Sequence, residues 1–154
     1  MKNLSPNVSK ALRYAKLKHE GQTYGYKPYI SHIESVIEKC QEIGLNYDEI
    51  LILACLHDVI EDANCSREEL EIIFGKDIAD NVWAISRQGE ESYKEYIERI
   101  ATYRGSDVFN VKLMDLLDNY TNTVLGGDDY NSLRARYGKA IRTMATFETH
   151  WEIK

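Results

Sequence analysis

Apolar residues recur three or four positions apart along most of the chain, the spacing that gathers them on one face of an α-helix. The stretch 47–60 is the most apolar example, with residues that would cover most of a helix surface: Ile50, Leu53, Ala54, Leu56 and Ile60. We therefore expect this helix to lie at the centre of the fold. The same spacing predicts helices at about 7–20, 31–43, 47–60, 66–74, 77–86, 92–104, 107–122 and 129–150.

Capping signals support these helix boundaries. Four segments open with a serine or asparagine followed three residues later by glutamate, a pattern that satisfies backbone amides at a helix start. These expected caps are Ser31, Asn46, Ser66 and Ser92. Other segments end at glycines suited to a left-handed helix end, namely Gly44, Gly75 and Gly105. No segment has the alternation of a convincing strand, so the sequence predicts a compact all-α fold of many helices.

Length and charge narrow the class of protein. A chain of 154 residues predicts a single domain, 1–154, with a sizeable core. The formal charge of −6 argues against broad binding to nucleic acid or to anionic membranes. The start lacks the apolar core of a signal peptide, and no run approaches transmembrane length. We expect a cytoplasmic protein whose three cysteines (Cys40, Cys55 and Cys65) are free thiols.

Charged residues interrupt the most apolar helix in the stretch "LACLHDVIEDA", which contains His57, Asp58, Glu61 and Asp62. One interpretation is that the helix ends near Asp58 and its acids face water. The other is that these groups hold a metal ion and act on a substrate, since a charge is expensive to bury without a partner.

Two further residues favour the metal interpretation. His32 lies in the first turn of a predicted helix, and Asp115 interrupts the apolar segment "VKLMDLLDN". Taken singly, His32 could be a surface residue and Asp115 a structural salt bridge. Together with His57 and Asp58, they make a set of two nitrogen and two oxygen ligands. Such a set leaves two octahedral positions open and suits Mn²⁺ or a similar ion.

Three blocks of sequence resemble a known family. The blocks "HEGQTYGYKPYISH", "ACLHDVIEDA" and "VKLMDLLDN" are similar to those of the HD-domain metal-dependent phosphohydrolases. More narrowly, they resemble the hydrolase domain of the RelA/SpoT-type alarmone enzymes of the stringent response and the stand-alone small alarmone hydrolases. The resemblance spans about residues 11–125 and keeps the three blocks in the family's order.

The resemblance implies an HD-domain fold and specific roles. His32, His57, Asp58 and Asp115 match the family's metal ligands, and the acids Glu61 and Asp62 match its catalytic pair. The implied reaction is hydrolysis of the 3′-pyrophosphate ester of (p)ppGpp to GDP or GTP and pyrophosphate. Glu61 would orient or deprotonate the attacking water, and Asp62 would assist proton transfer. The ion would lower the pKa of bound water toward about 7.

Substrate contacts are where the chain departs from the family. Asn119 and Lys112 match family residues near the substrate, although Lys112 could equally be an exposed structural lysine. The family's base-contacting arginine is replaced by Tyr24, which could stack on a base while Lys27 supplies charge. We expect Tyr29 to pack rather than to bind.

Two other positions bear on the charge near the expected site. Asp118 replaces a common histidine and adds negative charge. Arg87 is the nearest compensating cation, although a solvated loop arginine is the simpler interpretation.

Three functions follow, each with a small-molecule nucleotide as ligand. The first is an alarmone hydrolase acting beside a toxin synthetase or in a stress response. The second is a phosphohydrolase of the same fold acting on a dNTP, a nucleoside monophosphate or NADPH. The third is a sensory module that binds nucleotide without turnover. Intact Glu61 and Asp62 argue against the third. The tyrosine-rich later helices leave a homo-oligomer open.

Overall fold

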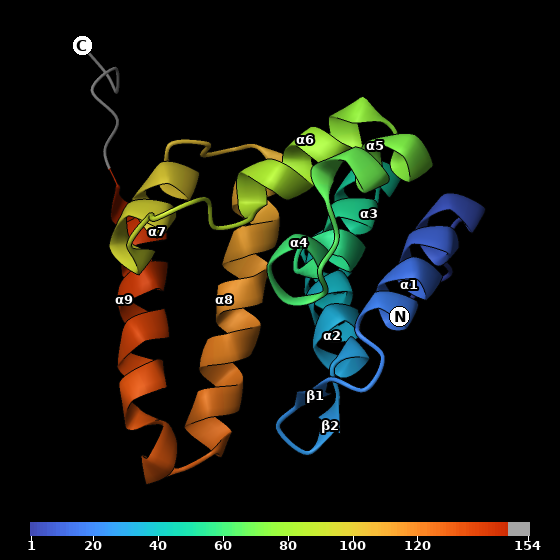
Figure 1. The fold of residues 1–154 in the computed structure, drawn as a ribbon. Coiled ribbons are helices and arrows are strands. Elements are labelled where there is room, and N and C mark those ends of the chain that lie inside the picture. The colour runs from blue at the N-terminus through green and yellow to red at the C-terminus, as the bar shows by residue number, and fades with distance from the viewer. Residues whose placement is uncertain (148–154) are drawn as a thin grey trace. The chain divides into compact units, whose positions relative to one another are not determined.

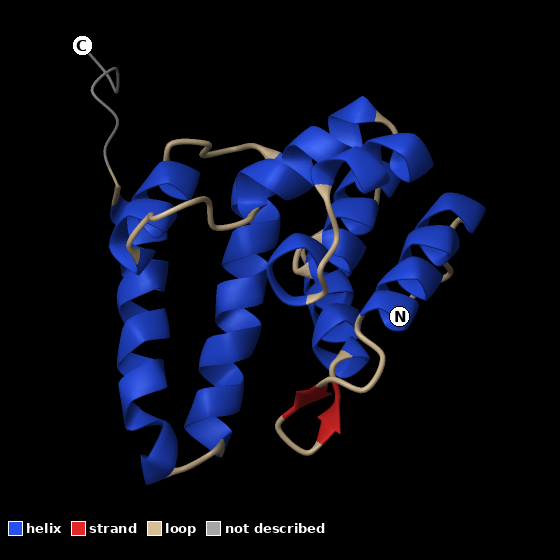
Figure 2. Ribbon diagram, viewed as in Figure 1, coloured by secondary structure: helices blue, strands red, loops and turns tan. Residues whose placement is uncertain are grey.

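The computed structural model describes residues 1–147, which are mostly helical, with loops between the helices and one small hairpin, as Figure 2 shows. The chain forms two compact units, Met1–Ser86 and Arg87–Lys154. The predicted all-α class is confirmed, whereas the prediction of one domain over 1–154 stays a prediction. Among residues 1–147, none of the helices combines the length and the hydropathy that a membrane-spanning segment requires.

The first unit is built around one buried helix. Its elements are α1 (Pro6–Lys18), β1 (Thr23–Tyr24), β2 (Lys27–Pro28), α2 (Ile30–Glu42), α3 (Asp48–Leu56), α4 (Val59–Asp62), α5 (Arg67–Phe74) and α6 (Lys76–Ile85) (Figure 1). Helix α3 packs against α1, α2 and α6, and α5 packs against α6. Every residue from Ile50 to Val59 is buried. The expectation that this segment is central to the fold holds within this unit.

Two details of this unit differ from the sequence prediction. Residues 23–28 form a small antiparallel hairpin in which Thr23 pairs with Pro28 and Tyr24 with Lys27. Strands of two residues are too short to show an alternating pattern, so they could not be recognised in the sequence. The predicted helix 47–60 ends at Leu56, a turn at His57 and Asp58 follows, and a single helical turn resumes at Val59.

The cap predictions were right at two positions and wrong at two. Ser66 and Ser92 each accept a hydrogen bond from the amide three residues later, and Ser92 forms a full capping box with Glu95. Helix α2 already begins at Ile30, so Ser31 lies inside it and is not its cap. Helix α3 begins at Asp48 with Tyr47 at the cap position, one residue beyond Asn46.

The second unit contains α7 (Tyr93–Ala101), α8 (Asp107–Leu125), a 3₁₀ turn (Asp128–Tyr130) and α9 (Asn131–Thr146). Figure 1 shows α8 and α9 side by side and antiparallel, and α7 packs against both. The buried apolar residues of these three helices include Ile97, Ile100, Leu116 and Met144. The last helix was predicted to reach residue 150. Helix α9 ends at Thr146, and residues 148–150 lie outside the described residues.

Candidate metal centre

The turn between α3 and α4 places His57 and Asp58 at the buried end of the central helix of the first unit. The ring of His57 is 2 % exposed, and its Nδ1 lies 2.8 Å from the carbonyl oxygen of Ala54, one turn earlier in α3. Its Nε2 lies 3.0 Å from Oδ2 of Asp58. The backbone of α3 thus fixes the orientation of the His57 ring, and the turn places the carboxylate of Asp58 beside its Nε2.

A second histidine reaches the same carboxylate from α2. His32 is 1 % exposed, and its Nε2 lies 3.6 Å from Oδ2 of Asp58. The rings of His32 and His57 meet edge to face, with centroids 5.4 Å apart. One potential ligand atom from each of His32, His57 and Asp58 lies within 4.8 Å of the others. The three residues that were predicted from separate blocks are therefore brought together in the first unit.

The hydrogen bond of His57 shows that this cluster fits a cation. A carbonyl oxygen can only accept, so Nδ1 of His57 donates to Ala54, and Nε2 of the neutral ring carries a lone pair. That lone pair faces a carboxylate oxygen at 3.0 Å, which is repulsive unless a proton or a metal ion lies between them. Histidines that bind metals through one nitrogen commonly donate the other N–H to a carbonyl in this way.

The acids of α4 differ in their surroundings. Glu61 and Asp62 are both exposed residues, but the carboxyl group of Asp62 faces the cluster, where it accepts a hydrogen bond from the hydroxyl of Tyr29 at 3.3 Å. Burial of that carboxyl group, and then the neighbouring Asp58 carboxylate, raise the pKa of Asp62. A pKa shifted in this direction suits a group that takes up and releases a proton during a reaction.

Tyr29 belongs to this site, contrary to the prediction that it only packs. Its hydroxyl donates to Oδ2 of Asp58 at 2.6 Å, and Oδ2 of Asp62 lies 3.3 Å from the same hydroxyl oxygen. Its ring stacks on His19, with centroids 4.6 Å apart and planes at 26°. A tyrosine ring can pack against a neighbour while its hydroxyl forms hydrogen bonds. The prediction was wrong because it treated packing and binding as exclusive.

The hairpin places Tyr24 against a predicted metal ligand. Its ring stacks on His32, with centroids 4.6 Å apart and planes at 25°. Lys27 pairs with Tyr24 across the hairpin and is exposed. The aromatic ring at the family's arginine position therefore supports the His32 ring, and the base-stacking role proposed for Tyr24 stays a prediction, as does the role of Lys27.

In the second unit, α8 carries Asp115 as a buried carboxylate that is 2 % exposed. Its Oδ2 lies 2.7 Å from Nζ of Lys112, and its Oδ1 accepts a hydrogen bond from Asn119 at 3.0 Å. Burial alone would lower the pKa of Lys112, but the charge of Asp115 holds that pKa well above its usual value. Lys112 is 8 % exposed, so the alternative of an exposed structural lysine is wrong.

Two other residues were singled out near the expected site. Arg87 donates from Nε to the carbonyl oxygen of Glu91, which ties it to its own loop. Asp118 is 3 % exposed on α8. The simpler interpretation of Arg87 as a loop residue agrees with its backbone contact, and its compensating role stays untested.

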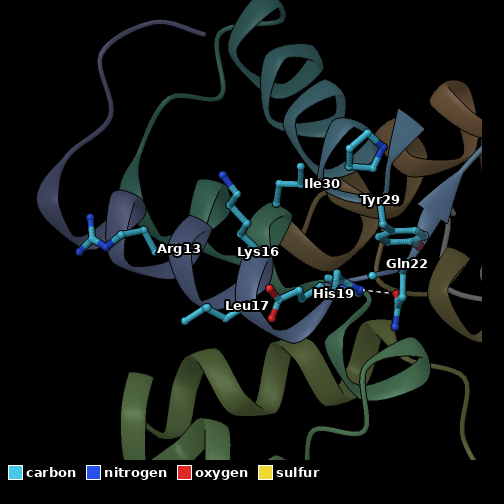
Figure 3. Close-up of a pocket in the computed structure, with 10 residues that line it drawn as sticks. Arg13, Lys16, Leu17, His19, Gln22, Tyr29 and Ile30 are labelled. Carbon is cyan, nitrogen blue, oxygen red and sulfur yellow. Dashed lines mark hydrogen bonds between the residues drawn. The ribbon is translucent and has the colours of Figure 1, made fainter. Parts of the chain in front are cut away.

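Sequence reasoning gave no role to His19 and Gln22, which the fold links to the candidate centre. His19 is 3 % exposed, and its Nδ1 lies 2.8 Å from Oε1 of Gln22 (Figure 3). Gln22 in turn donates from Nε2 to the carbonyl oxygen of Asp62 at 2.6 Å. Both belong to the quoted block "HEGQTYGYKPYISH", so the signal was the resemblance itself.

Known proteins that resemble the chain identify its family and support its fold. No protein-family model matches the chain. It is 31 % identical over 127 residues to guanosine-3′,5′-bis(diphosphate) 3′-pyrophosphohydrolase MESH1 of Drosophila melanogaster, covering 75 % of this chain and 68 % of that protein. A solved structure of a metazoan ortholog of SpoT, described as hydrolysing ppGpp, superposes with a TM-score of 0.78 at 24 % identity. That match covers 97 % of this chain and 91 % of the other, and it supports the fold.

Longer bacterial proteins also match over part of their length. Guanosine-3′,5′-bis(diphosphate) 3′-pyrophosphohydrolase of Aquifex aeolicus is 35 % identical over 119 residues, which is 73 % of this chain and 17 % of that protein. Bifunctional (p)ppGpp synthase/hydrolase SpoT of Escherichia coli is 38 % identical over 89 residues, which is 57 % of this chain and 12 % of that protein. The chain thus spans under one fifth of these two relatives, but about two thirds of the fly protein. It belongs to the family of the guanosine-3′,5′-bis(diphosphate) 3′-pyrophosphohydrolases.

Proposed function

We propose that the chain is a metal-dependent phosphohydrolase that cleaves the 3′-pyrophosphate of ppGpp to give GDP and pyrophosphate. The observation that carries the proposal is the buried cluster of His32, His57 and Asp58, in which two histidine nitrogens approach one carboxylate oxygen. The family membership and the reaction that its named members carry out support the choice of substrate.

The metal proposed is Mn²⁺, held by His32, His57 and Asp58 with Asp115 as the fourth ligand. Two neutral imidazoles and two carboxylates form a mixed nitrogen and oxygen set that suits such an ion. Asp115 is included because it is a buried carboxylate and because its motif matches the family. When bound, the ion would supply a Lewis acid for the phosphate oxygens and would make water more acidic.

The acids near the cluster are proposed to handle protons. Asp62, whose pKa is raised, would give a proton to the leaving group or relay it, and Glu61 would orient or deprotonate the attacking water. Tyr29 would hold the Asp58 and Asp62 carboxyl groups in a fixed relation, because its hydroxyl contacts both. The exposure of both α4 acids would allow exchange of protons with solvent.

Lys112 and Asn119 were predicted to contact the substrate. Their hydrogen bonds to Asp115 suggest that they also orient this carboxylate. Each contacts one oxygen of Asp115, so together they would fix the rotamer of that carboxylate. We propose that Lys112 acts chiefly on Asp115, because its ammonium is buried. Asn119 stays proposed as a substrate contact because its position matches the asparagine that the family has near the substrate.

The test is product analysis with purified, Mn²⁺-loaded protein. Incubation with ppGpp is expected to yield GDP and pyrophosphate in equal amounts, with no free orthophosphate. Glu61→Gln and Asp62→Asn are expected to lower kcat by at least about 100-fold, within the range for loss of a general acid or base. Orthophosphate as the first product would contradict cleavage at the 3′ ester.

A second candidate function is hydrolysis of another nucleotide by the same centre. The observation that favours it is Tyr24, which stacks on His32 at the position where the family has a base-contacting arginine. A panel of dNTPs, nucleoside monophosphates and NADPH beside ppGpp decides between the two. A higher kcat/KM on any of these than on ppGpp would favour the second candidate. The Tyr24→Arg variant would then be expected to shift the preference back toward ppGpp.

A further inference from the structure

We propose that Gln22 is a positioning residue for the reaction: oriented by His19, it fixes α4 so that the Asp62 carboxyl group faces Asp58. The inference deepens the proposed function and rests on it for the role of Asp62. It depends on contacts within the first unit, where Figure 3 shows His19, Gln22 and Tyr29 gathered between the end of α1 and the start of α2.

The amide of Gln22 has one orientation that satisfies both of its neighbours. The carbonyl oxygen of Asp62 lies 2.6 Å away and can only accept, so the amide nitrogen faces it. The amide oxygen then faces Nδ1 of His19 at 2.8 Å, which requires that nitrogen to carry the proton. His19 thus determines which way the Gln22 amide points, and Gln22 delivers its N–H to α4.

Helix α4 needs such a contact because it is a single turn. It comprises only Val59–Asp62, and so short a helix has little stability of its own. The last carbonyl groups of any helix lack partners within it. The side chain of Gln22 supplies a partner for the carbonyl of Asp62, the residue whose side chain is proposed to act in the reaction.

The segment that contains His19, Gln22 and Tyr29 also positions the side chain of Asp62. The amide of Tyr29 donates to the carbonyl oxygen of Gln22 at 3.0 Å, and the ring of Tyr29 stacks on His19. The Tyr29 hydroxyl then contacts the carboxylates of Asp58 and Asp62. The backbone and the side chain of Asp62 are therefore both held by one small set of residues: His19, Gln22 and Tyr29.

Gly21 makes the return of the chain possible. Its φ of +82° is a left-handed conformation that favours glycine, and it lets the chain reverse after α1 so that the amide of Gln22 bonds to the carbonyl of His19 at 3.0 Å.

The test compares Gln22→Met, which keeps the length of the side chain but removes both hydrogen bonds, with Gln41→Met. Gln41 is a matched control, because it is a buried glutamine on α2 whose oxygen accepts from the amide of Lys2 at 3.1 Å, away from α4. With ppGpp, Gln22→Met is expected to lower kcat about 10- to 100-fold, as expected for a misplaced catalytic group, with KM changed by less than about twofold. Gln41→Met is expected to leave both unchanged.

A pair of His19 variants separates positioning from packing. The side-chain amide of Asn can place an N–H near the position of Nδ1, so His19→Asn is expected to retain most of kcat. His19→Leu fills the space without a donor and is expected to match Gln22→Met. Equal loss in His19→Asn and His19→Leu would contradict the proposed hydrogen-bond role.

Hydrogen exchange of the metal-free protein gives a readout that needs no turnover. Peptides covering residues 57–65 are expected to exchange faster in Gln22→Met and His19→Leu than in wild type, and at the wild-type rate in Gln41→Met. Unchanged exchange in this segment, or an unchanged kcat in Gln22→Met, would overturn the inference. A wild type that does not hydrolyse ppGpp would refute the proposed function alone, and the exchange rates would still decide whether Gln22 positions α4.

Discussion

At the scale of single residues, Asp58 is the residue on which the candidate centre converges. Two histidine nitrogens and the hydroxyl of Tyr29 approach one of its oxygens, Oδ2. The tyrosine hydroxyl can donate to a carboxylate, whereas a neutral imidazole nitrogen with a lone pair cannot. The hydroxyl therefore stabilises the charged form of Asp58. The space between Oδ2 and the two histidine nitrogens is where a cation would bind.

The first prediction concerns this hydroxyl. Tyr29→Phe removes the donor to Asp58 and keeps the ring that stacks on His19. Because residues that orient metal ligands affect affinity by about 10- to 100-fold, we expect Mn²⁺ binding measured by calorimetry to weaken by that factor. Tyr14→Phe is the control, since the Tyr14 hydroxyl bonds to Glu69 instead. Equal Mn²⁺ affinity of Tyr29→Phe and wild type would show that the hydroxyl does not orient the ligand.

The second prediction follows from the raised pKa of Asp62. A carboxyl group whose pKa is higher in the folded than in the unfolded state destabilises the fold once the pH exceeds the unfolded value, about 3.9. In metal-free protein, Asp62→Asn is therefore expected to unfold at a higher temperature than wild type at pH 7. The difference should shrink as the pH falls and should vanish below about 3.9. A variant that is less stable than wild type at pH 7 would contradict the stated environment of Asp62.

At the scale of elements, α8 shows how helical spacing assembles a polar group on a mostly apolar helix. Lys112, Asp115 and Asn119 are three and four residues apart, so their side chains share one face. The spacing could be recognised in the sequence, and the burial of Asp115 was expected from its apolar neighbours. The burial of Lys112 could not be foreseen, since lysine is seldom buried unless it is paired.

The third prediction tests this buried pair. Lys112→Met leaves Asp115 charged without its closest cation, so it is expected to lower the free energy of unfolding by about 3–5 kcal/mol in urea titrations. Lys94→Met is the control, because it removes the exposed pair of Lys94 with Glu98 on α7 and should change that energy by less than about 1 kcal/mol. Similar small changes in the free energy of unfolding of both variants would show that the buried Asp115 carboxylate does not need Lys112 for stability.

The helices themselves were predictable because their apolar faces are long and regular. The break at His57 and Asp58 was foreseen only in the interpretation that the helix ends near Asp58, and the predicted helix 47–60 ran through it. His57 and Asp58 both have right-handed helical backbone angles, and the amide of Asp62 still bonds to the carbonyl of Asp58 at 2.9 Å. The backbone between α3 and α4 therefore stays close to helical, and the helical spacing of apolar residues continues across the interruption. The two-residue strands of the hairpin were missed for a similar reason.

At the scale of the whole molecule, the sequence identified the candidate ligands but not the residues that hold them. His32, His57 and Asp58 come from two segments that the resemblance singled out, and the fold of the first unit brings them together. The contacts of Tyr29 with Asp58 and of Gln22 with Asp62 join residues 29 and 40 positions apart. Such pairs depend on how α1, the hairpin and α4 pack, which periodicity does not encode.

The fourth prediction concerns metal and global stability. A ligand that binds only the folded state stabilises it by about 2.7 kcal/mol at a concentration 100 times its Kd. Mn²⁺ is therefore expected to raise the unfolding temperature of the wild type. The shift should be absent in the His57→Ala, Asp58→Ala double variant and reduced in Asp115→Asn. A full shift in Asp115→Asn would remove Asp115 from the proposed ligand set.

The most direct test of the account is pyrophosphate release from ppGpp by the Mn²⁺-loaded wild type, measured beside the His57→Ala, Asp58→Ala double variant and the wild type treated with a chelator. We predict steady release by the loaded wild type, none by the double variant, and loss of release with chelator that added Mn²⁺ restores. Release that persists in the double variant, or no release from a wild type with bound Mn²⁺, would contradict the assignment of this centre to ppGpp hydrolysis.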